Sequence, residues 1–215
     1  MPMTVIIPLK ALASAKGRLA PALSPAHRRD FVAWMARRVI AACQACEAVE
    51  DILVVAGDES AADVARGAGV DVVVVPQPGL DAALGAADSL TRDSDSTLVV
   101  AADLPQLTEQ DLFAVVAAAA ATSDAAVVVA PTHDGGTGAL LRRPPGVIAT
   151  AYGDGSAAEH ERRGRAVGAS TAIVRRPGLA ADVDTPAELP AALALVAGQH
   201  VGSASESGAR PASPA

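Results

Sequence analysis

Both lysines of the chain, Lys10 and Lys16, lie in one short segment that follows the first apolar run. Arg18 comes next, and most of the residues between these cations are small. Small residues let backbone amides approach a phosphate, and cationic side chains neutralise its charge. The segment has neither the spacing of a P-loop nor a G-x-G-x-x-G motif. We interpret it as a phosphate-binding loop, with a merely solubilising loop as the alternative.

Three aspartates are candidate metal ligands. Asp103 follows the apolar run 96–102, and Asp182 and Asp184 stand two residues apart much later in the chain. Proteins hold Mg²⁺ through one or two carboxylates together with substrate phosphates. Metal-assisted phosphoryl transfer takes its carboxylates from separate segments. Each aspartate could instead cap a turn or the next helix, but the three together favour a metal site.

Two glycine-rich turns each end in a hydroxyl residue. They are Asp134-Gly-Gly-Thr137 and Gly153-Asp-Gly-Ser156. Backbone amides together with a hydroxyl group can form an anion-binding nest, and the second turn also opens a helix whose N-terminus favours an anion. Ordinary turns would have the same composition. His160 lies close to the second turn, and no Ser-His-Asp arrangement stands out.

The elements that must position these residues alternate along the chain. Short, nearly continuous apolar runs predict strands buried on both faces. Helical segments lie between them, with N-cap signals at Ser24 and Thr108 and at Thr185, which precedes Pro186. This alternation predicts a doubly wound α/β sheet, whose ligands bind at the carboxyl ends of the strands. The predicted strands are 4–9, 51–56, 71–75, 96–102, 125–130, a short one through 141, and 170–175; the predicted helices are 25–46, 59–68, 80–90, 108–121, one from about 157, and 187–197.

Composition and charge exclude several classes of protein. The formal net charge is −7, so the basic face needed to bind nucleic acid is not expected. No apolar run reaches the roughly 18 residues of a membrane helix, and no basic region precedes the first apolar run as in a signal peptide. We therefore expect a cytoplasmic protein. The two cysteines, Cys43 and Cys46, lack the second pair of a zinc ribbon and are interpreted as reduced structural residues.

Five motifs in chain order resemble one family. They are VIIPLKALASAKGRL, ADLPQL, DGGTGAL, YGDGSAAEH and DVDTPAEL. The chain resembles the guanylyltransferases of coenzyme F-420 biosynthesis, which join GMP from GTP to a small phosphorylated three-carbon acid. This resemblance implies the fold of the nucleotide-diphospho-sugar transferases, a Rossmann-like three-layer α/β sandwich with a mostly parallel sheet. It assigns residues 1–198 to a nucleotidyltransferase domain, and the Ser-, Gly-, Ala- and Pro-rich segment 199–215 remains as a disordered tail.

The resemblance also implies roles for individual residues. Carried over by position, the resemblance assigns catalysis to Lys16, Arg18 and Asp103, and Mg²⁺ binding to Asp103, Asp182 and Asp184. It assigns binding of the triphosphate to Lys10, Lys16 and Arg18. Binding of the three-carbon phosphate is assigned to Thr137, Gly153 and Ser156. The chain departs from the family in three places. Gly138 stands where Asn is frequent, YGDGS replaces FGPGS, and a GLN-type motif ends in Asp81.

The activity implied by the resemblance is transfer of GMP from GTP to phosphoenolpyruvate, or to 2-phospho-L-lactate, with release of pyrophosphate. The arginine-rich composition suggests an actinobacterium, and the resemblance implies phosphoenolpyruvate as the acceptor in actinobacteria. Two alternatives stay open: another nucleotidyltransferase of this fold, acting on a molybdopterin or a sugar phosphate, and a non-catalytic nucleotide-binding regulator. The implied partners are GTP and the three-carbon acid, with neither nucleic acid nor membrane. A homodimer and direct hand-over of the unstable product to the next enzyme are compatible with this reading.

Overall fold

The computed structural model describes residues 3–76, 79–122 and 124–204, with the backbone alone for 197–204. Its centre is one seven-stranded sheet with the order β3-β2-β1-β4-β6-β5-β7. Strand β6 runs antiparallel to both of its neighbours, and the other pairs are parallel. The strands are β1 (Met3–Leu9), β2 (Asp51–Ala56), β3 (Asp71–Val74), β4 (Ser96–Val100), β5 (Ala126–Pro131), β6 (Thr137–Arg143) and β7 (Ser170–Ile173).

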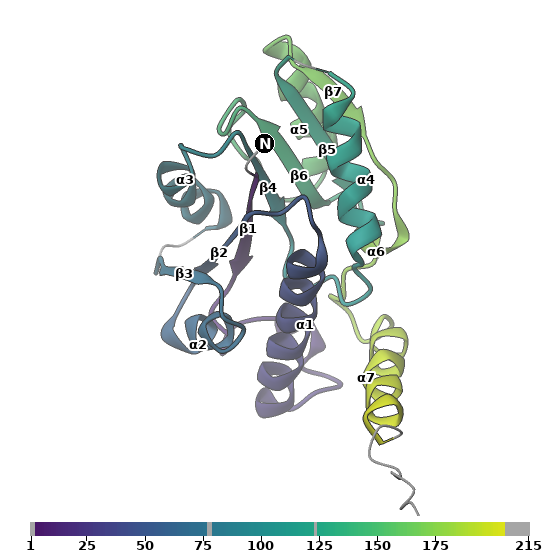
Figure 1. The fold of residues 1–215 in the computed structure, drawn as a ribbon. Coiled ribbons are helices and arrows are strands. Elements are labelled where there is room, and N and C mark those ends of the chain that lie inside the picture. The colour runs from purple at the N-terminus through teal and green to yellow at the C-terminus, as the bar shows by residue number, and fades with distance from the viewer. Residues whose placement is uncertain (1–2, 77–78, 123, 205–215) are drawn as a thin grey trace, which may run out of the picture.

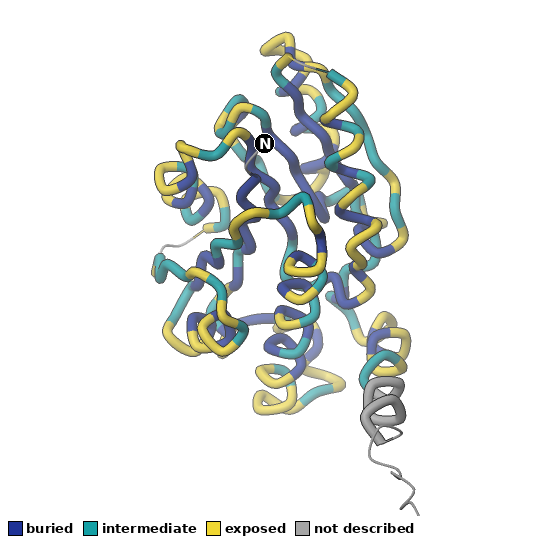
Figure 2. Tube along the Cα trace, in the orientation of Figure 1, coloured by how far each residue is buried: buried dark blue, intermediate teal, exposed yellow. Residues whose placement is uncertain are grey.

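Helices cover both faces of the sheet, which gives the predicted three-layer sandwich (Figure 1). One face packs against α1 (Pro25–Ala45), α2 (Glu59–Gly67) and α4 (Glu109–Ala120). The other face packs against α3 (Leu80–Leu90) and α5 (Ser156–Ala166). In Figure 2 the strands form a buried centre, while the helices expose their outer sides. Burial on both faces explains why the strand sequences are continuously apolar instead of alternating.

Local capping signals set the ends of two helices as predicted. The Ser24 hydroxyl accepts a hydrogen bond from the His27 amide at the start of α1, with Pro25 at the first helical position. Thr108 and Asp111 form a reciprocal capping box at the start of α4. The N-cap of α1 and the capping box of α4 each satisfy backbone amides that have no partner inside the helix. The loop predicted between β1 and α1 contains one 3₁₀ turn, Gly17–Leu19.

The C-terminal elements differ from the prediction. A four-residue helix that was not predicted, α6 (Pro177–Ala180), precedes Asp182, and the last helix, α7 (Leu189–Ala204), begins and ends later than expected. Thr185 is not its N-cap, because the Glu188 carboxylate accepts the amides of Asp184 and Thr185 and closes a turn there. Residues 199–204, predicted as part of the tail, continue α7, and 205–215 lie outside the described residues.

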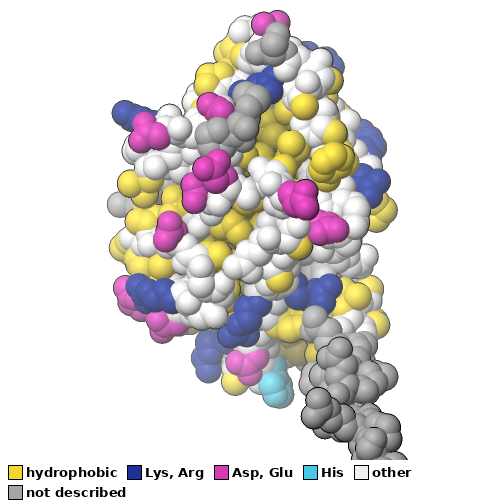
Figure 3. All heavy atoms as spheres, viewed as in Figure 1, with side chains coloured by type: hydrophobic (Ala, Val, Ile, Leu, Met, Phe, Trp, Pro, Cys, Tyr) yellow, Lys and Arg dark blue, Asp and Glu magenta, His cyan; other side chains and the backbone are white. Residues whose placement is uncertain are grey.

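Other predictions concern the surface and the cysteines. Within the described residues no helix is long and apolar enough to cross a membrane. On the face drawn in Figure 3, acidic and basic side chains are interspersed. Cys43 and Cys46 are free and buried, and burial raises the pKa of the Cys43 thiol to about 12. This agrees with two structural cysteines.

Candidate active site

All nine predicted site residues line one cavity at the carboxyl ends of β1 and β4. Loops after these strands supply the cations and Asp103. The start of β6 also reaches this edge, because an antiparallel strand begins where its parallel neighbours end. The segment after α6 brings in the last carboxylates. The nine residues are Lys10, Lys16, Arg18, Asp103, Thr137, Gly153, Ser156, Asp182 and Asp184.

Lys16 lies between two of the predicted metal ligands. Its ammonium group contacts the carboxylates of Asp103 and Asp184, and its side chain is only 10% exposed. Burial alone would lower the pKa of Lys16, but the attraction and hydrogen bonds of Asp103 and Asp184 outweigh it and raise the pKa. Lys16 is therefore a cation held between the two acidic groups.

The backbone of Lys16 is in the left-handed region, with φ 54° and ψ 44°. Among non-glycine residues of the described chain, it is the only one with positive φ. Such a conformation is costly for a residue with a Cβ and persists where surrounding contacts enforce it. The other two cations are freer: Arg18 is 76% exposed and 3.7 Å from Asp184, and Lys10 is exposed at the cavity rim.

The carboxylates of the cavity repel one another. Burial and, to a smaller extent, the negative charges of Asp103, Asp134 and Asp184 together raise the pKa of Asp182 to about 6. Among the described residues, no three acidic, histidine or cysteine side chains already stand together as a metal-binding group. The acidic groups are thus assembled but partly neutralised by Lys16.

Asp111 connects the two loops that carry these carboxylates. It is buried in the first turn of α4, shortly after Asp103, and its carboxylate accepts hydrogen bonds from the Thr108 amide and hydroxyl. The same carboxylate accepts a 2.9 Å hydrogen bond from Arg176 Nε, at the start of α6. The Asp103 loop and the segment that leads to Asp182 are thereby fixed to one side chain.

The first glycine-rich turn does not present an open anion nest. The Asp134 carboxylate accepts the Thr132 hydroxyl at 2.5 Å and the Gly136 amide at 3.0 Å, and these bonds lower the pKa of Asp134. The Asp134 carboxylate thus already accepts the Gly136 amide hydrogen that an external anion would need. Asp134 and Asp154 also line the cavity, so its wall has two acidic residues beyond the three predicted as metal ligands.

The second glycine-rich turn is open. The amides of Gly153, Asp154 and Gly155 donate no hydrogen bond within the described chain. Gly153 and Gly155 have φ of 135° and 69°, a backbone shape that favours glycine. Beside this turn, the Ser156 and Thr137 hydroxyl oxygens lie 2.9 Å apart. Free amides, two hydroxyl groups and the start of α5 form a site suited to an anion.

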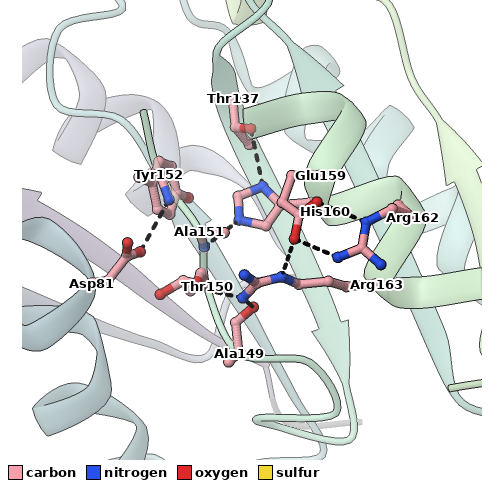
Figure 4. A network of polar contacts seen from close by, with 10 residues as sticks. All are labelled: Asp81, Thr137, Ala149, Thr150, Ala151, Tyr152, Glu159, His160, Arg162 and Arg163. Carbon is pink, nitrogen blue, oxygen red and sulfur yellow. Dashed lines mark hydrogen bonds and ion pairs between the residues drawn. The ribbon is translucent and has the colours of Figure 1, made fainter. Parts of the chain in front are cut away.

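Side chains from two helices fix the segment 149–152 that leads into this turn (Figure 4). Arg163 donates to the carbonyl oxygens of Ala149 and Thr150, each at 3.0 Å. The Ala151 amide donates to His160 Nε2 at 2.9 Å, and the Tyr152 amide donates to Asp81 Oδ1 at 3.1 Å. Asp81, one of the departures from the family pattern, therefore has a backbone partner.

Comparison with known proteins matches residues 3–201 to the family described as Guanylyl transferase CofC like. The chain belongs to this family. A phosphoenolpyruvate guanylyltransferase of Sphaerobacter thermophilus is 36% identical over 191 residues, which cover 88% of this guanylyl transferase and 91% of the relative. A phosphoenolpyruvate guanylyltransferase of Mycolicibacterium gilvum is 37% identical over 201 residues, 90% of each chain. The family predicted from the motifs is confirmed.

Solved structures confirm the fold of this guanylyl transferase. A nucleotidyl transferase from Methanothermobacter has a TM-score of 0.68 at 16% identity, over 92% of this chain and 99% of the other. A protein described as a nucleotide-diphospho-sugar transferase of Desulfovibrio desulfuricans scores 0.66 at 14% identity, over 86% and 84%. Glucosyl-3-phosphoglycerate synthase of Mycobacterium tuberculosis, solved with Mn²⁺, UDP and phosphoglyceric acid, scores 0.61 at 14% identity, over 91% and 76%.

These likenesses favour one of the readings left open by the sequence. The chain is a nucleotidyltransferase, and neither a non-catalytic regulator nor a transferase for another acceptor class is better supported.

Proposed function

We propose that this guanylyltransferase transfers GMP from GTP to phosphoenolpyruvate, with release of pyrophosphate, in coenzyme F-420 biosynthesis. The observation that carries the proposal is one cavity with two different anion sites. At one end the Lys16, Asp103 and Asp184 cluster suits a metal-bound triphosphate. At the other end, the free Gly153 amide and the Ser156 hydroxyl suit the phosphate of a small acid. The names of the curated relatives indicate which acid that is.

The reaction requires little covalent chemistry from the protein. A phosphate oxygen of the acceptor attacks the α-phosphorus of GTP, and a new P–O bond forms as the bond to pyrophosphate breaks. A phosphate is already ionised near neutral pH, so no general base is needed. Catalysis then comes from positioning and from preorganised positive charge. Lys16 and Arg18 supply that charge beside the triphosphate.

The chain's own donors fit a Mg²⁺ ion. Mg²⁺ needs only one or two protein carboxylates when phosphates complete its shell, so a preformed group of three ligands is not required. Asp103, Asp182 and Asp184 are the carboxylates that would hold it. Burial and the neighbouring carboxylates raise the pKa of Asp182, and a cation would offset both effects. When bound, Mg²⁺ neutralises charge on the phosphates. Lys16 competes for the same carboxylates, and we propose that it turns to the triphosphate when they are engaged.

A screen of donors and acceptors tests the proposal. GTP, ATP, CTP and UTP are each combined with phosphoenolpyruvate, 2-phospho-L-lactate or 3-phosphoglycerate in Mg²⁺, and pyrophosphate and product mass are measured. We expect pyrophosphate only with GTP, fastest with phosphoenolpyruvate, and a product with the mass of a GMP adduct. Faster turnover with 2-phospho-L-lactate would change the acceptor. Turnover with another nucleotide only, or with none of the acids, would refute the proposal.

A further inference from the structure

His160 joins the two parts of the proposed acceptor site without lining the cavity. Its side chain is fully buried on α5. Nδ1 lies 3.1 Å from the Thr137 hydroxyl oxygen, and Nε2 lies 2.9 Å from the Ala151 amide nitrogen (Figure 4). The ring therefore connects the first residue of β6 with the segment that precedes Gly153.

The Ala151 contact determines which ring nitrogen carries the proton. A backbone amide can only donate, so Nε2 must accept and is unprotonated. In a neutral imidazole the proton is then on Nδ1, and Nδ1–H donates to the Thr137 oxygen. The backbone of residue 151 thus fixes the tautomer that faces Thr137.

With this tautomer, one hydroxyl hydrogen of the Thr137–Ser156 pair stays available for a ligand. Thr137 and Ser156 together carry two hydroxyl hydrogens, and one of them lies in the 2.9 Å bond between the two oxygens. The Thr137 oxygen already accepts from His160, so it needs no other donor. Whichever way the pair is oriented, one O–H group remains for a ligand. An anion, which only accepts hydrogen bonds, is the ligand that matches it.

We infer that His160 is a positioning residue for the acceptor: its Nδ1–H holds the Thr137 oxygen in place without taking a hydrogen from it, so that the Thr137–Ser156 pair offers a hydroxyl hydrogen to the acceptor phosphate. This inference rests on the proposed function. His160 itself touches no substrate, and its effect reaches the phosphate through Thr137. The Ala151 bond is one of several that fix residues 149–152, because Arg163 and Asp81 also bind the backbone there.

The surroundings keep the ring neutral. Burial lowers the pKa of His160 to about 4, and the positive charges of Arg163 and Arg142 act in the same direction against the weaker opposing effects of Asp81 and Glu159. A protonated ring would carry a hydrogen on Nε2 and would lose the Ala151 bond. Near neutral pH the ring therefore stays in the form that both contacts require.

Substitution of His160 by asparagine or by glutamine separates the contributions of the two ring nitrogens. His160→Asn places a donor near the Nδ1 position but does not reach Ala151, whereas His160→Gln places an acceptor near Nε2 but leaves Thr137 without a donor. We expect the Gln variant to raise the KM for phosphoenolpyruvate about tenfold or more, with the KM for GTP and the melting temperature near wild type. The Asn variant should keep the acceptor KM within about threefold and lose melting temperature instead. His27→Asn, an exposed residue on α1, is the control.

A double-mutant cycle tests whether the effect passes through Thr137. If it does, Thr137→Val combined with His160→Gln should weaken acceptor use no more than Thr137→Val alone. Additive losses, or equal losses for GTP and acceptor in every variant, would show a structural role only and overturn the inference.

Histidine ¹⁵N NMR gives a readout that does not depend on turnover. The chain has four histidines, and the signal lost in His160→Asn assigns the ring. The expected spectrum has the proton on Nδ1 at neutral pH in the free protein; a proton on Nε2 would overturn the inference whatever the activity. Absence of product from GTP and every acid tested, with the Nδ1–H form present, would instead refute the proposed function and the phosphate role built on it.

Discussion

Lys16 is an internal counter-ion for the carboxylates of the proposed metal site. Its ammonium group lies between Asp103 and Asp184 in a backbone conformation that costs free energy for a lysine. Removing the partner of a buried charge is usually more harmful than the pair is beneficial. Single substitutions in this cluster should therefore affect both stability and activity.

Asp103→Asn should leave the protein folded and slow GMP transfer by about a thousandfold or more. The substitution removes a charge that the proposed mechanism places on the metal, which corresponds to several kcal/mol of barrier. Pyrophosphate release in Mg²⁺ and the melting temperature are the measurements. Asp93→Asn, at an exposed site outside the cavity, is the matched control. Near-normal turnover of the folded variant would remove Asp103 from the catalytic residues.

Asp182→Asn should stabilise the metal-free protein at neutral pH. The folded pKa of about 6 exceeds the usual carboxyl value near 4, so the folded state binds this proton more tightly than the unfolded state. Stability from this group is present below pH ~4 and is lost as the pH rises through 6. The asparagine side chain does not ionise, so the Asp182→Asn variant avoids that loss of stability.

Melting temperatures with a chelator should thus be higher for Asp182→Asn than for wild type at about pH 7.5 and similar at about pH 4.5. The substitution should also reduce the stabilisation of the protein by Mg²⁺. A variant that is less stable than wild type at the higher pH would contradict this account of Asp182.

At the scale of elements, the contact of α6 with β6 explains one departure from the family pattern. A Cβ atom added at Gly138 would overlap the Leu179 carbonyl oxygen, so the asparagine frequent at this position cannot fit without moving α6. The short helix lies close against the strand because this residue is glycine. The consequence reaches the site, since α6 leads directly to Asp182.

Gly138→Ala should lower the melting temperature by several degrees, as expected for overpacking of about 1–3 kcal/mol. Thermal unfolding measures it, with Gly67→Ala in α2 as control, because nothing lies within 4 Å of the added methyl group there. The control should be neutral or slightly stabilising. A Gly138→Ala protein as stable as wild type would show that α6 moves at little cost.

Elements set by local signals were predictable, and elements set by distant contacts were not. The caps at Ser24 and Thr108 act within three residues, so sequence alone located α1 and α4. The direction of β6 and its place beside β4 depend on pairing across the sheet. The pattern at Thr185 and Pro186 indicated a helix start, but the Glu188 carboxylate binds the amides there and the helix starts later.

The same distinction holds for the candidate site. Lysines and aspartates were found because their side chains are charged and scarce or stand at predicted strand ends. His160 and Asp81 were missed because their partners are backbone amides, one of them 71 residues away. Such a partner leaves no signature in residue type. Proximity of His160 to the second glycine-rich turn was the one available signal.

Across the whole molecule, the proposed site is divided between two parts of the sheet. In the proposed arrangement, β1 and β4 with their loops bind the nucleotide, and β6 with the start of α5 binds the acceptor. The two parts meet where β4 pairs with β6. Substitutions in one part should therefore affect one substrate more than the other.

Lys16→Ala should raise the KM for GTP about tenfold and lower turnover, with little change in affinity for phosphoenolpyruvate. Thr137→Val should show the opposite pattern, with weaker acceptor binding and GTP affinity kept. Isothermal calorimetry with each substrate measures both affinities directly. Similar losses for both substrates in both variants would disprove the division.

The reversed strand β6 also has a consequence for synthesis of the chain. During translation, β1 to β4 leave the ribosome first and can pair with one another, but the outer edge of β4 must wait for β6, which is made after β5. In that interval an apolar strand with a free edge is exposed to other nascent chains. Pairing of β6 with β4 covers this edge. The strand that brings Thr137 into the proposed acceptor site therefore also removes an aggregation-prone surface from the growing chain.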